Sequence, residues 1–148
     1  MKIYLASPLG FSELGRLGLQ PLKDKLVSLG HKVYDPWDLD YNKALKEAWI
    51  KEDVDLDHVS FPYNIGRQNK VLLDETDCVL AVLDGQELDS GTVAELAYAV
   101  GRGKVSYGYR GDVRNVDGLP GIPFNLQVWY FILFSGGRIF RSIDEIDI

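Results

Sequence analysis

The strongest constraint on the fold is an uninterrupted apolar run at residues 78–83, Cys-Val-Leu-Ala-Val-Leu. Asp77 precedes this run and Asp84-Gly85 follows it, so polar and turn-forming residues bound it on both sides. A short, continuous apolar run of this kind is typical of a parallel strand that is covered on both faces. We therefore expect a central strand here. Its cysteine, Cys78, is the only one in the chain and is expected to be a buried strand residue rather than a nucleophile.

Short strands and helical segments alternate along the rest of the chain. Leu22, Leu26 and Leu29 recur at helical spacing. Pro21 fits the first turn of this helix, and Gly30 is expected to end it. Further helices are expected at residues 41–57, 65–75 and 92–102, and further strands at residues 2–6, 31–34, 104–109 and 138–141.

Residues 127–134 are ambiguous, because their aromatic and β-branched content favours a strand whereas their position suits a helix. The alternation elsewhere predicts a parallel sheet with helices on both faces, formed by one domain over residues 1–148. Ligands of such sheets bind beyond the carboxyl ends of the strands. The loops after residues 6, 34, 83 and 109 are therefore the expected site.

The overall composition narrows the range of partners. The 148 residues include 22 acidic and 16 basic side chains, which gives a net charge of −6. An acidic surface repels phosphate backbones, so we expect no nucleic-acid partner. No apolar stretch reaches membrane-spanning length, and the N-terminus has no signal-peptide layout, so we expect a cytoplasmic protein with no membrane partner. His31 and His58 have no partners at metal-ligand spacing, and we expect no metal.

The first candidate for chemistry is the segment at residues 89–95, Asp-Ser-Gly-Thr-Val-Ala-Glu. Thr92 and Glu95 have the spacing of a capping box, which is a purely structural interpretation. The functional interpretation uses the same placement. A carboxylate in the first turn of a helix is held ionised by the helix dipole and the free N–H groups, and attack on an anomeric carbon needs such a group.

Three other polar or small-residue segments are candidates for ligand contact. Residues 3–11, Ile-Tyr-Leu-Ala-Ser-Pro-Leu-Gly-Phe, lead from a strand into a small-residue loop that a ligand can approach closely, although the segment is not a phosphate loop. Residues 66–69, Gly-Arg-Gln-Asn, form a polar helix turn, and Asn125 is by default a helix cap. Arg110 and Arg114 have the charge to bind an anion, but the intervening acidic residue weakens that interpretation.

Together these segments resemble the nucleoside 2-deoxyribosyltransferase family over nearly the whole chain. No single motif is decisive, but their order and spacing are fairly specific. The resemblance implies a flavodoxin-like, doubly wound α/β fold with a mostly parallel five-stranded sheet. It rests on residues 3–11, residues 35–37 (Asp-Pro-Trp), residues 67–69 (Arg-Gln-Asn), residues 88–96 (Leu-Asp-Ser-Gly-Thr-Val-Ala-Glu-Leu) and residues 124–127 (Phe-Asn-Leu-Gln).

The resemblance also implies roles for individual residues. Glu95 matches the nucleophile that forms a covalent deoxyribosyl-enzyme, and Tyr4 matches the tyrosine that steadies this carboxylate. Asp89 matches the aspartate that binds the sugar 5′-hydroxyl. Asn125 matches an asparagine that reaches the same hydroxyl from a neighbouring subunit, and Gln127 lies where the neighbour lines the site. This implies a homo-oligomer with shared active sites.

The remaining substrate-binding assignments are Gly10, Phe11, Trp37 and Asn69. Asn69 stands where several family members have an aspartate that contacts the base and handles its proton, a task to which an amide is poorly suited. Trp37 or its neighbours stand near a base-binding glutamine of other members. These two departures leave the choice among purine and pyrimidine bases open.

The expected activity is transfer of 2-deoxyribose between nucleobases, a reaction of nucleoside salvage. The substrates are a 2′-deoxynucleoside and a free base, two inversions at C1′ give net retention, and no cofactor is implied. One alternative is a 2′-deoxynucleoside 5′-monophosphate N-glycosidase, in which water replaces the acceptor base. Another is a non-catalytic nucleotide-binding module. A receiver domain ranks last, because Asp84 ends a central strand but no acidic pair follows the first strand.

Overall fold

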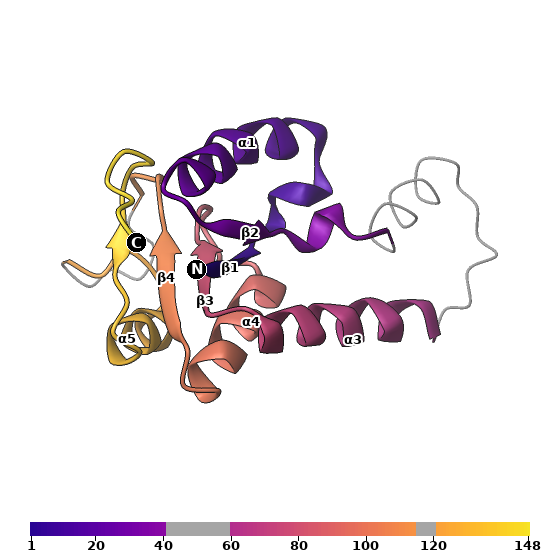
Figure 1. The fold of residues 1–148 in the computed structure, drawn as a ribbon. Coiled ribbons are helices and arrows are strands. Elements are labelled where there is room, and N and C mark those ends of the chain that lie inside the picture. The colour runs from indigo at the N-terminus through magenta and orange to yellow at the C-terminus, as the bar shows by residue number, and fades with distance from the viewer. Residues whose placement is uncertain (41–59, 115–120) are drawn as a thin grey trace.

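The computed structural model describes residues 1–40, 60–114 and 121–148. Five strands form one sheet in the order β2-β1-β3-β4-β5, and every pair of neighbouring strands is parallel. This is the flavodoxin-like order. The chain adds strands toward one edge of the sheet up to β2 and toward the other edge from β3 onward, so the order of the strands reverses between β1 and β3. The order confirms the predicted fold class (Figure 1). The strands are β1 (Lys2–Ala6), β2 (Lys32–Tyr34), β3 (Cys78–Val82), β4 (Val105–Tyr109) and β5 (Ile139–Phe140).

The apolar run at 78–83 forms the central strand, as predicted. All five residues of β3 are buried, and the strand pairs with β1 on one side and β4 on the other. The register aligns Ile3 with Cys78 and Ala6 with Ala81, so β3 ends one residue beyond the end of β1. The loops that follow these two strands therefore meet at the point where the strand order reverses, which is the expected ligand crevice.

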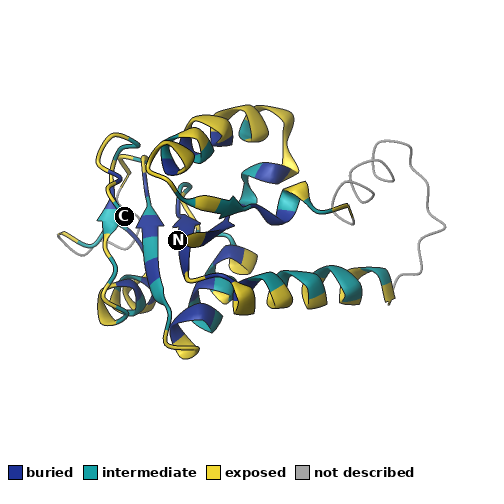
Figure 2. Cartoon of the chain, in the orientation of Figure 1, coloured by how far each residue is buried: buried dark blue, intermediate teal, exposed yellow. Residues whose placement is uncertain are grey.

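Alternate side chains of the sheet pack into two separate cores. Tyr4 and Ala6 of β1 belong to the core beneath α3 (Ser60–Glu75), α4 (Ser90–Gly101) and α5 (Leu126–Phe134). Ile3 and Leu5 belong to the core beneath α1 (Glu13–Ser28). Figure 2 shows the buried strands between these helices, whose outer faces are exposed. Helices therefore cover both faces of the sheet, and Tyr4 points toward α3 and α4.

The start of the first helix was predicted wrongly. Pro21 lies inside α1, which begins at Glu13 after an N-cap at Ser12. The buried side chains of α1 include Leu19 before the proline and Leu22 after it. The packing of these side chains against the sheet therefore offsets the cost of the backbone hydrogen bond that the proline cannot donate. Gly30 follows the helix with a φ of 84°, as expected of a glycine that ends a helix.

The ambiguous segment 127–134 is helical and forms α5. The Asn125 side chain caps this helix by accepting hydrogen bonds from the backbone N–H groups of Gln127 and Val128, at 3.0 and 3.3 Å. Two other helices begin earlier than predicted, α3 at Ser60 and α4 at Ser90. The predicted helix at residues 41–57 and His58 lie outside the described residues.

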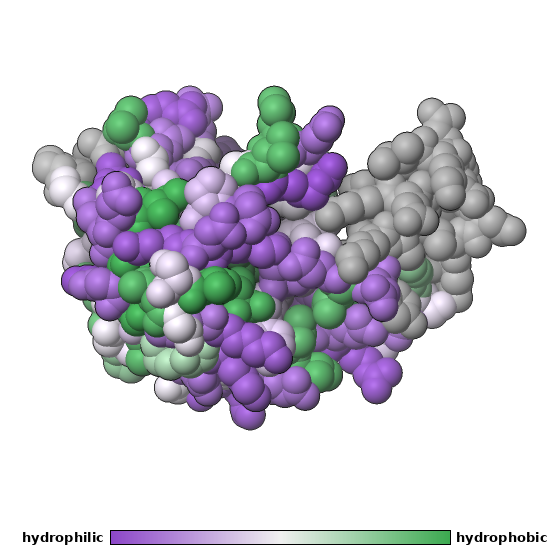
Figure 3. Space-filling model, turned by 45° about the horizontal axis from the view of Figure 1, so that its top comes forward, coloured by the Kyte–Doolittle hydropathy of each residue, from purple (hydrophilic) through white to green (hydrophobic). Residues whose placement is uncertain are grey.

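Hydrophilic side chains form most of the face shown in Figure 3, and apolar side chains gather between them in several patches. This agrees with the charged composition of the chain. Among the described helices, none has both the length and the apolar character needed to cross a membrane.

Candidate active site

Glu95 lies at the centre of a small hydrogen-bonded group formed by three elements. The Tyr4 hydroxyl, on β1, donates to Glu95 Oε1 over 2.6 Å. The Asn69 amide nitrogen, on α3, donates to the same oxygen over 3.3 Å. Glu95 itself is in the second turn of α4. The structure therefore brings together three residues that are 26 and 91 positions apart in the sequence.

Burial dominates the electrostatics of this group. The pKa of Glu95 is raised to about 7 in total: desolvation raises it most, the hydrogen bonds from Tyr4 and Asn69 lower it, and the charges of Asp89 and Asp35 raise it. Burial and the nearby Glu95 also raise the pKa of Tyr4 far above its usual value, so its phenol stays a proton donor. The site thus holds a carboxylate that ionises near neutral pH and that two fixed donors orient.

The capping box predicted from Thr92 and Glu95 is wrong. The N-cap of α4 is Asp89, whose Oδ2 accepts hydrogen bonds from the Thr92 backbone N–H at 2.8 Å and the Thr92 hydroxyl at 3.0 Å. Because Asp89 is the cap, the helix begins two residues earlier and Glu95 falls in its second turn. Its carboxylate bonds to Tyr4 and Asn69 instead of reaching back to the start of the helix, and burial raises its pKa, so the expectation that the first turn of the helix holds it ionised is wrong as well.

A cavity of about 330 Å³ opens in front of Glu95. Its volume lies in the range of small-molecule sites. Its lining combines two carboxylates, Asp89 and Glu95, with an aromatic pair, Phe11 and Trp37, whose ring centroids are 4.4 Å apart and whose planes meet at 74°. The lining residues are Ser7, Phe11, Pro36, Trp37, Ile65, Asn69, Asp89, Ser90, Gly91, Thr92 and Glu95.

Trp37 is held in this cavity by its backbone and its ring. The Asp35 carboxylate accepts from the Trp37 backbone N–H at 2.9 Å and pairs with Lys23 at 3.1 Å. The indole N–H donates to the Ser7 carbonyl over 2.8 Å. Gly10 lies directly against the indole, because a Cβ at this position would be 2.0 Å from Trp37 Cδ2. Gly10 therefore supports the wall of the cavity rather than lining it.

The amide nitrogen of Asn69 has a hydrogen-bond partner, whereas its amide oxygen has none within the described residues. Its nitrogen donates to Glu95, which fixes the orientation of the amide because a carboxylate needs a donor. Its Oδ1 is buried and finds no hydrogen-bond partner within the described part of the chain. A buried acceptor without a partner is a position at which a ligand N–H group can bind.

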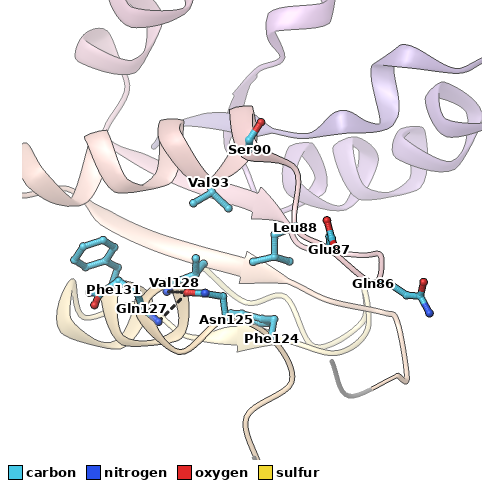
Figure 4. Close-up of a pocket in the computed structure, with 10 residues that line it drawn as sticks. All are labelled: Gln86, Glu87, Leu88, Ser90, Val93, Phe124, Asn125, Gln127, Val128 and Phe131. Carbon is cyan, nitrogen blue, oxygen red and sulfur yellow. Dashed lines mark hydrogen bonds between the residues drawn. The ribbon is translucent and has the colours of Figure 1, made fainter. Parts of the chain in front are cut away.

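Asn125 and Gln127 do not line the Glu95 cavity of their own chain. They line a second pocket of about 480 Å³, in which Leu88 and Val93 lie opposite Phe124 at the start of α5 (Figure 4). Other residues of this pocket are Gln86, Glu87, Ser90, Val128 and Phe131, and Ser90 also lines the first cavity.

Several residues that line the first cavity received no role from the sequence. Ser7 and Ser90 lie within the motifs at residues 3–11 and 88–96, and Ile65 directly precedes the motif at residues 66–69. Arg110 was interpreted as a weak anion site, yet its side chain is completely buried and bonds to backbone carbonyls. In the described ranges, no cluster of three or more His, Cys, Asp or Glu side chains has the arrangement of a metal site.

The fold and the site together define an α/β protein with a carboxylate centre at the switch point of a parallel sheet. A family model described as nucleoside 2-deoxyribosyltransferase matches residues 3–128. The chain therefore belongs to the nucleoside 2-deoxyribosyltransferase family.

Two solved structures illustrate how widely the fold is shared. One is a 2-deoxyribosyltransferase from Bacillus psychrosaccharolyticus, which is 20% identical with a TM-score of 0.71, over 100% of this chain and 93% of that one. The other is a conserved protein from Enterococcus faecalis V583, also 20% identical with a TM-score of 0.72, over 98% and 93% of the two chains. At this identity the likeness concerns the fold. A comparison with curated proteins gave no match.

Proposed function

We propose that this protein transfers 2-deoxyribose between nucleobases, with Glu95 as the covalent nucleophile. The observation that carries the proposal is the Glu95 carboxylate itself. It faces a cavity of nucleoside size, it receives hydrogen bonds from Tyr4 and Asn69, and it ionises near neutral pH. Membership of the family makes N-glycosidic chemistry the expected use of such a group.

In the first half-reaction, Glu95 attacks C1′ of the deoxynucleoside while the C1′–N bond breaks and the base takes the bonding electrons. The product is a sugar ester of Glu95 and the base anion, which takes one proton from water to become the free base. In the second half-reaction, the nitrogen of an incoming base attacks C1′ from the face that the first base left, the C1′–O bond to Glu95 breaks so that the carboxylate is released, and the N–H proton of the incoming base passes to water. Two inversions give net retention. No step needs an organic cofactor or a metal.

The cavity offers separate surfaces for base and sugar. Phe11 and Trp37 provide aromatic faces against which a base can stack. The free Oδ1 of Asn69 can accept from a base N–H, but the amide has no proton to give to a leaving base. Asp89, which lines the same cavity, can accept a hydrogen bond from the sugar 5′-hydroxyl.

The complete site is proposed to need a second copy of the chain, which would supply Asn125 and Gln127. The apolar surface of α5 supports this, because Leu126, Tyr130 and Phe134 are 52%, 49% and 67% exposed. Light scattering combined with activity measurements tests the idea, and a fully active monomer would contradict it.

A single incubation of 2′-deoxyadenosine with a second free base tests the proposed activity. A new deoxynucleoside supports the transferase. Free deoxyribose with no new nucleoside would indicate a hydrolase, and the absence of turnover would indicate a binding module. The same incubation with 2′-deoxyadenosine 5′-monophosphate distinguishes a nucleotide hydrolase from a nucleoside hydrolase.

A further inference from the structure

Arg110 is a fully buried arginine that the proposed chemistry does not use. It follows β4 directly, and its guanidinium donates to three backbone carbonyls, those of Leu83, Gly85 at 3.2 Å and Arg114 at 3.0 Å. Leu83 and Gly85 belong to the loop after β3, and Arg114 belongs to the loop after β4. A buried charge is costly, so a cation at this position needs several good hydrogen bonds to be tolerated.

Asp112 strengthens the same connection from the opposite direction. Its carboxylate accepts from the Gly85 backbone N–H at 3.2 Å, and its own backbone N–H donates to Asp84 Oδ1 at 2.9 Å. Arg110 and Asp112, which we call the loop clamp, therefore hold both the carbonyl and the amide of Gly85. Gly85 has a φ of 112°, a conformation that favours glycine, so the loop turns sharply at the point that the clamp holds.

The clamped loop leads directly to the sugar side of the site. Four residues after Gly85 the chain reaches Asp89, the cap of α4 and part of the Glu95 cavity. The Arg110 guanidinium also lies over the Phe124 ring, 5.7 Å from its centroid. Figure 4 shows Phe124 and Leu88 on opposite sides of the second pocket, so Arg110 contacts the Phe124 side of the groove that adjoins the site.

We propose that Arg110 is a positioning residue for the sugar subsite. With Asp112, it fixes the loop after β3 so that Asp89 faces the 5′-hydroxyl of the deoxynucleoside. The inference rests on the proposed function, because it takes the role of Asp89 from there. Arginine suits the task because its planar guanidinium donates in several fixed directions at once, whereas a lysine ammonium is a single point of charge on a flexible stem.

The test compares two nucleosides that differ only at the 5′ position, 2′-deoxyadenosine and 2′,5′-dideoxyadenosine. For Arg110→Lys we expect kcat/KM on 2′-deoxyadenosine to fall about 10-fold or more, the scale of a small misplacement of a binding group. On the 5′-deoxy compound, assayed at raised enzyme concentration, kcat/KM should stay within about twofold of wild type. Arg102→Lys is the matched control. It makes the same change at the C-cap of α4, at the other end of this helix from Asp89, and should alter neither value.

Equal losses on both nucleosides, or no loss on either, would overturn the proposal, because a merely structural arginine does not distinguish a 5′-hydroxyl. If Arg110→Lys does not fold, Asp112→Ala must show the same substrate-dependent loss. Asp89→Ala separates this inference from the proposed function. If Asp89→Ala lowers kcat/KM on 2′-deoxyadenosine but not on the 5′-deoxy compound, and the clamp variants lower both values equally or neither, only the inference fails. If Asp89→Ala also treats them alike, the assigned role of Asp89 fails with it.

Discussion

The hydroxyl of Tyr4 donates a 2.6 Å hydrogen bond to Glu95 Oε1 and so joins β1 to α4. A bond this short to an ionisable carboxyl group is stronger than one between neutral partners. Tyr4 is completely buried, so the position of its hydroxyl is fixed by the sheet. The carboxylate is therefore held in place by the rigid core of the protein.

Glu95→Gln is expected to reduce transfer by several orders of magnitude while the fold is retained. Glutamine can still accept from Tyr4, but its amide cannot form the sugar ester. The measurement is formation of a new deoxynucleoside by purified protein, with circular dichroism as a control for folding. Substantial residual transfer by the folded variant would contradict the assignment of Glu95 as the nucleophile.

Tyr4→Phe is expected to reduce turnover less than Glu95→Gln does. The lost hydrogen bond to a charged group is worth about 1.5–3 kcal/mol, roughly 10- to 150-fold in rate. Because this bond lowers the pKa of Glu95, its removal raises that pKa further. The acidic limb of the kcat/KM profile, near pH 7 in wild type, should therefore move to higher pH. An unchanged rate and limb would mean that Tyr4 only packs in the strand.

Glu95→Gln is also expected to stabilise the protein at alkaline pH. The pKa of Glu95 is about 7 in the folded chain against an ordinary value of 4.5, so the folded state binds more protons between these values. Stability of wild type is therefore lost as pH rises through this window, by at most about 3 kcal/mol. The advantage of Glu95→Gln should grow from pH 4.5 to pH 7 and then level off. Urea unfolding at several pH values measures it, and a pH-independent difference would contradict the raised pKa.

Gly10→Ala is expected to impair substrate binding by displacing Trp37. An alanine Cβ would lie 2.0 Å from the indole, a distance that no packing tolerates, so the ring must move out of the cavity wall. We expect KM for the nucleoside to rise and Trp fluorescence to change. Gly18→Ala is the control, because a Cβ there meets no atom within 4 Å and alanine favours the helix. Equal kinetics for both variants would show that the ring does not form the base-binding wall.

The sheet was predicted well from the sequence, because apolar runs indicate buried strands and turn residues indicate where these strands end. The run at 78–83 identified β3, and helix-and-strand alternation was enough for the fold class. Residues 127–134 could not be assigned, because α5 has an almost uniformly apolar sequence and so no clear period. Tertiary packing and the Asn125 cap determine its conformation.

The same limits apply to the site. Asp89, Ser90 and Thr92 are all good cap residues within four positions, and spacing alone favoured the wrong one. The burial of Arg110 was not predictable from the sequence, because arginine is usually exposed and two of its three backbone partners, Leu83 and Gly85, lie 27 and 25 positions away. Glu95 was a candidate from its own segment, whereas the link between Tyr4 and Glu95 came only from the resemblance, because 91 positions separate the two residues.

The last prediction concerns the choice between nucleosides and their 5′-monophosphates, and it depends on Asp89. The Asp89 carboxylate occupies the N-cap of α4, where the helix N–H groups would otherwise favour a phosphate. An ionised carboxylate can only accept hydrogen bonds, so it suits a 5′-hydroxyl and repels a phosphate. At an effective dielectric near 20, two unit charges at about 4 Å repel by roughly 4 kcal/mol before screening.

Because Asp89 is half-buried, solvent and salt screen only part of this repulsion. We therefore expect kcat/KM to be at least about tenfold higher for 2′-deoxyadenosine than for its 5′-monophosphate. Asp89→Ser should narrow this gap, mainly by lowering activity on the nucleoside, whereas equal efficiency of wild type on both substrates would rule out this role and favour a nucleotide hydrolase.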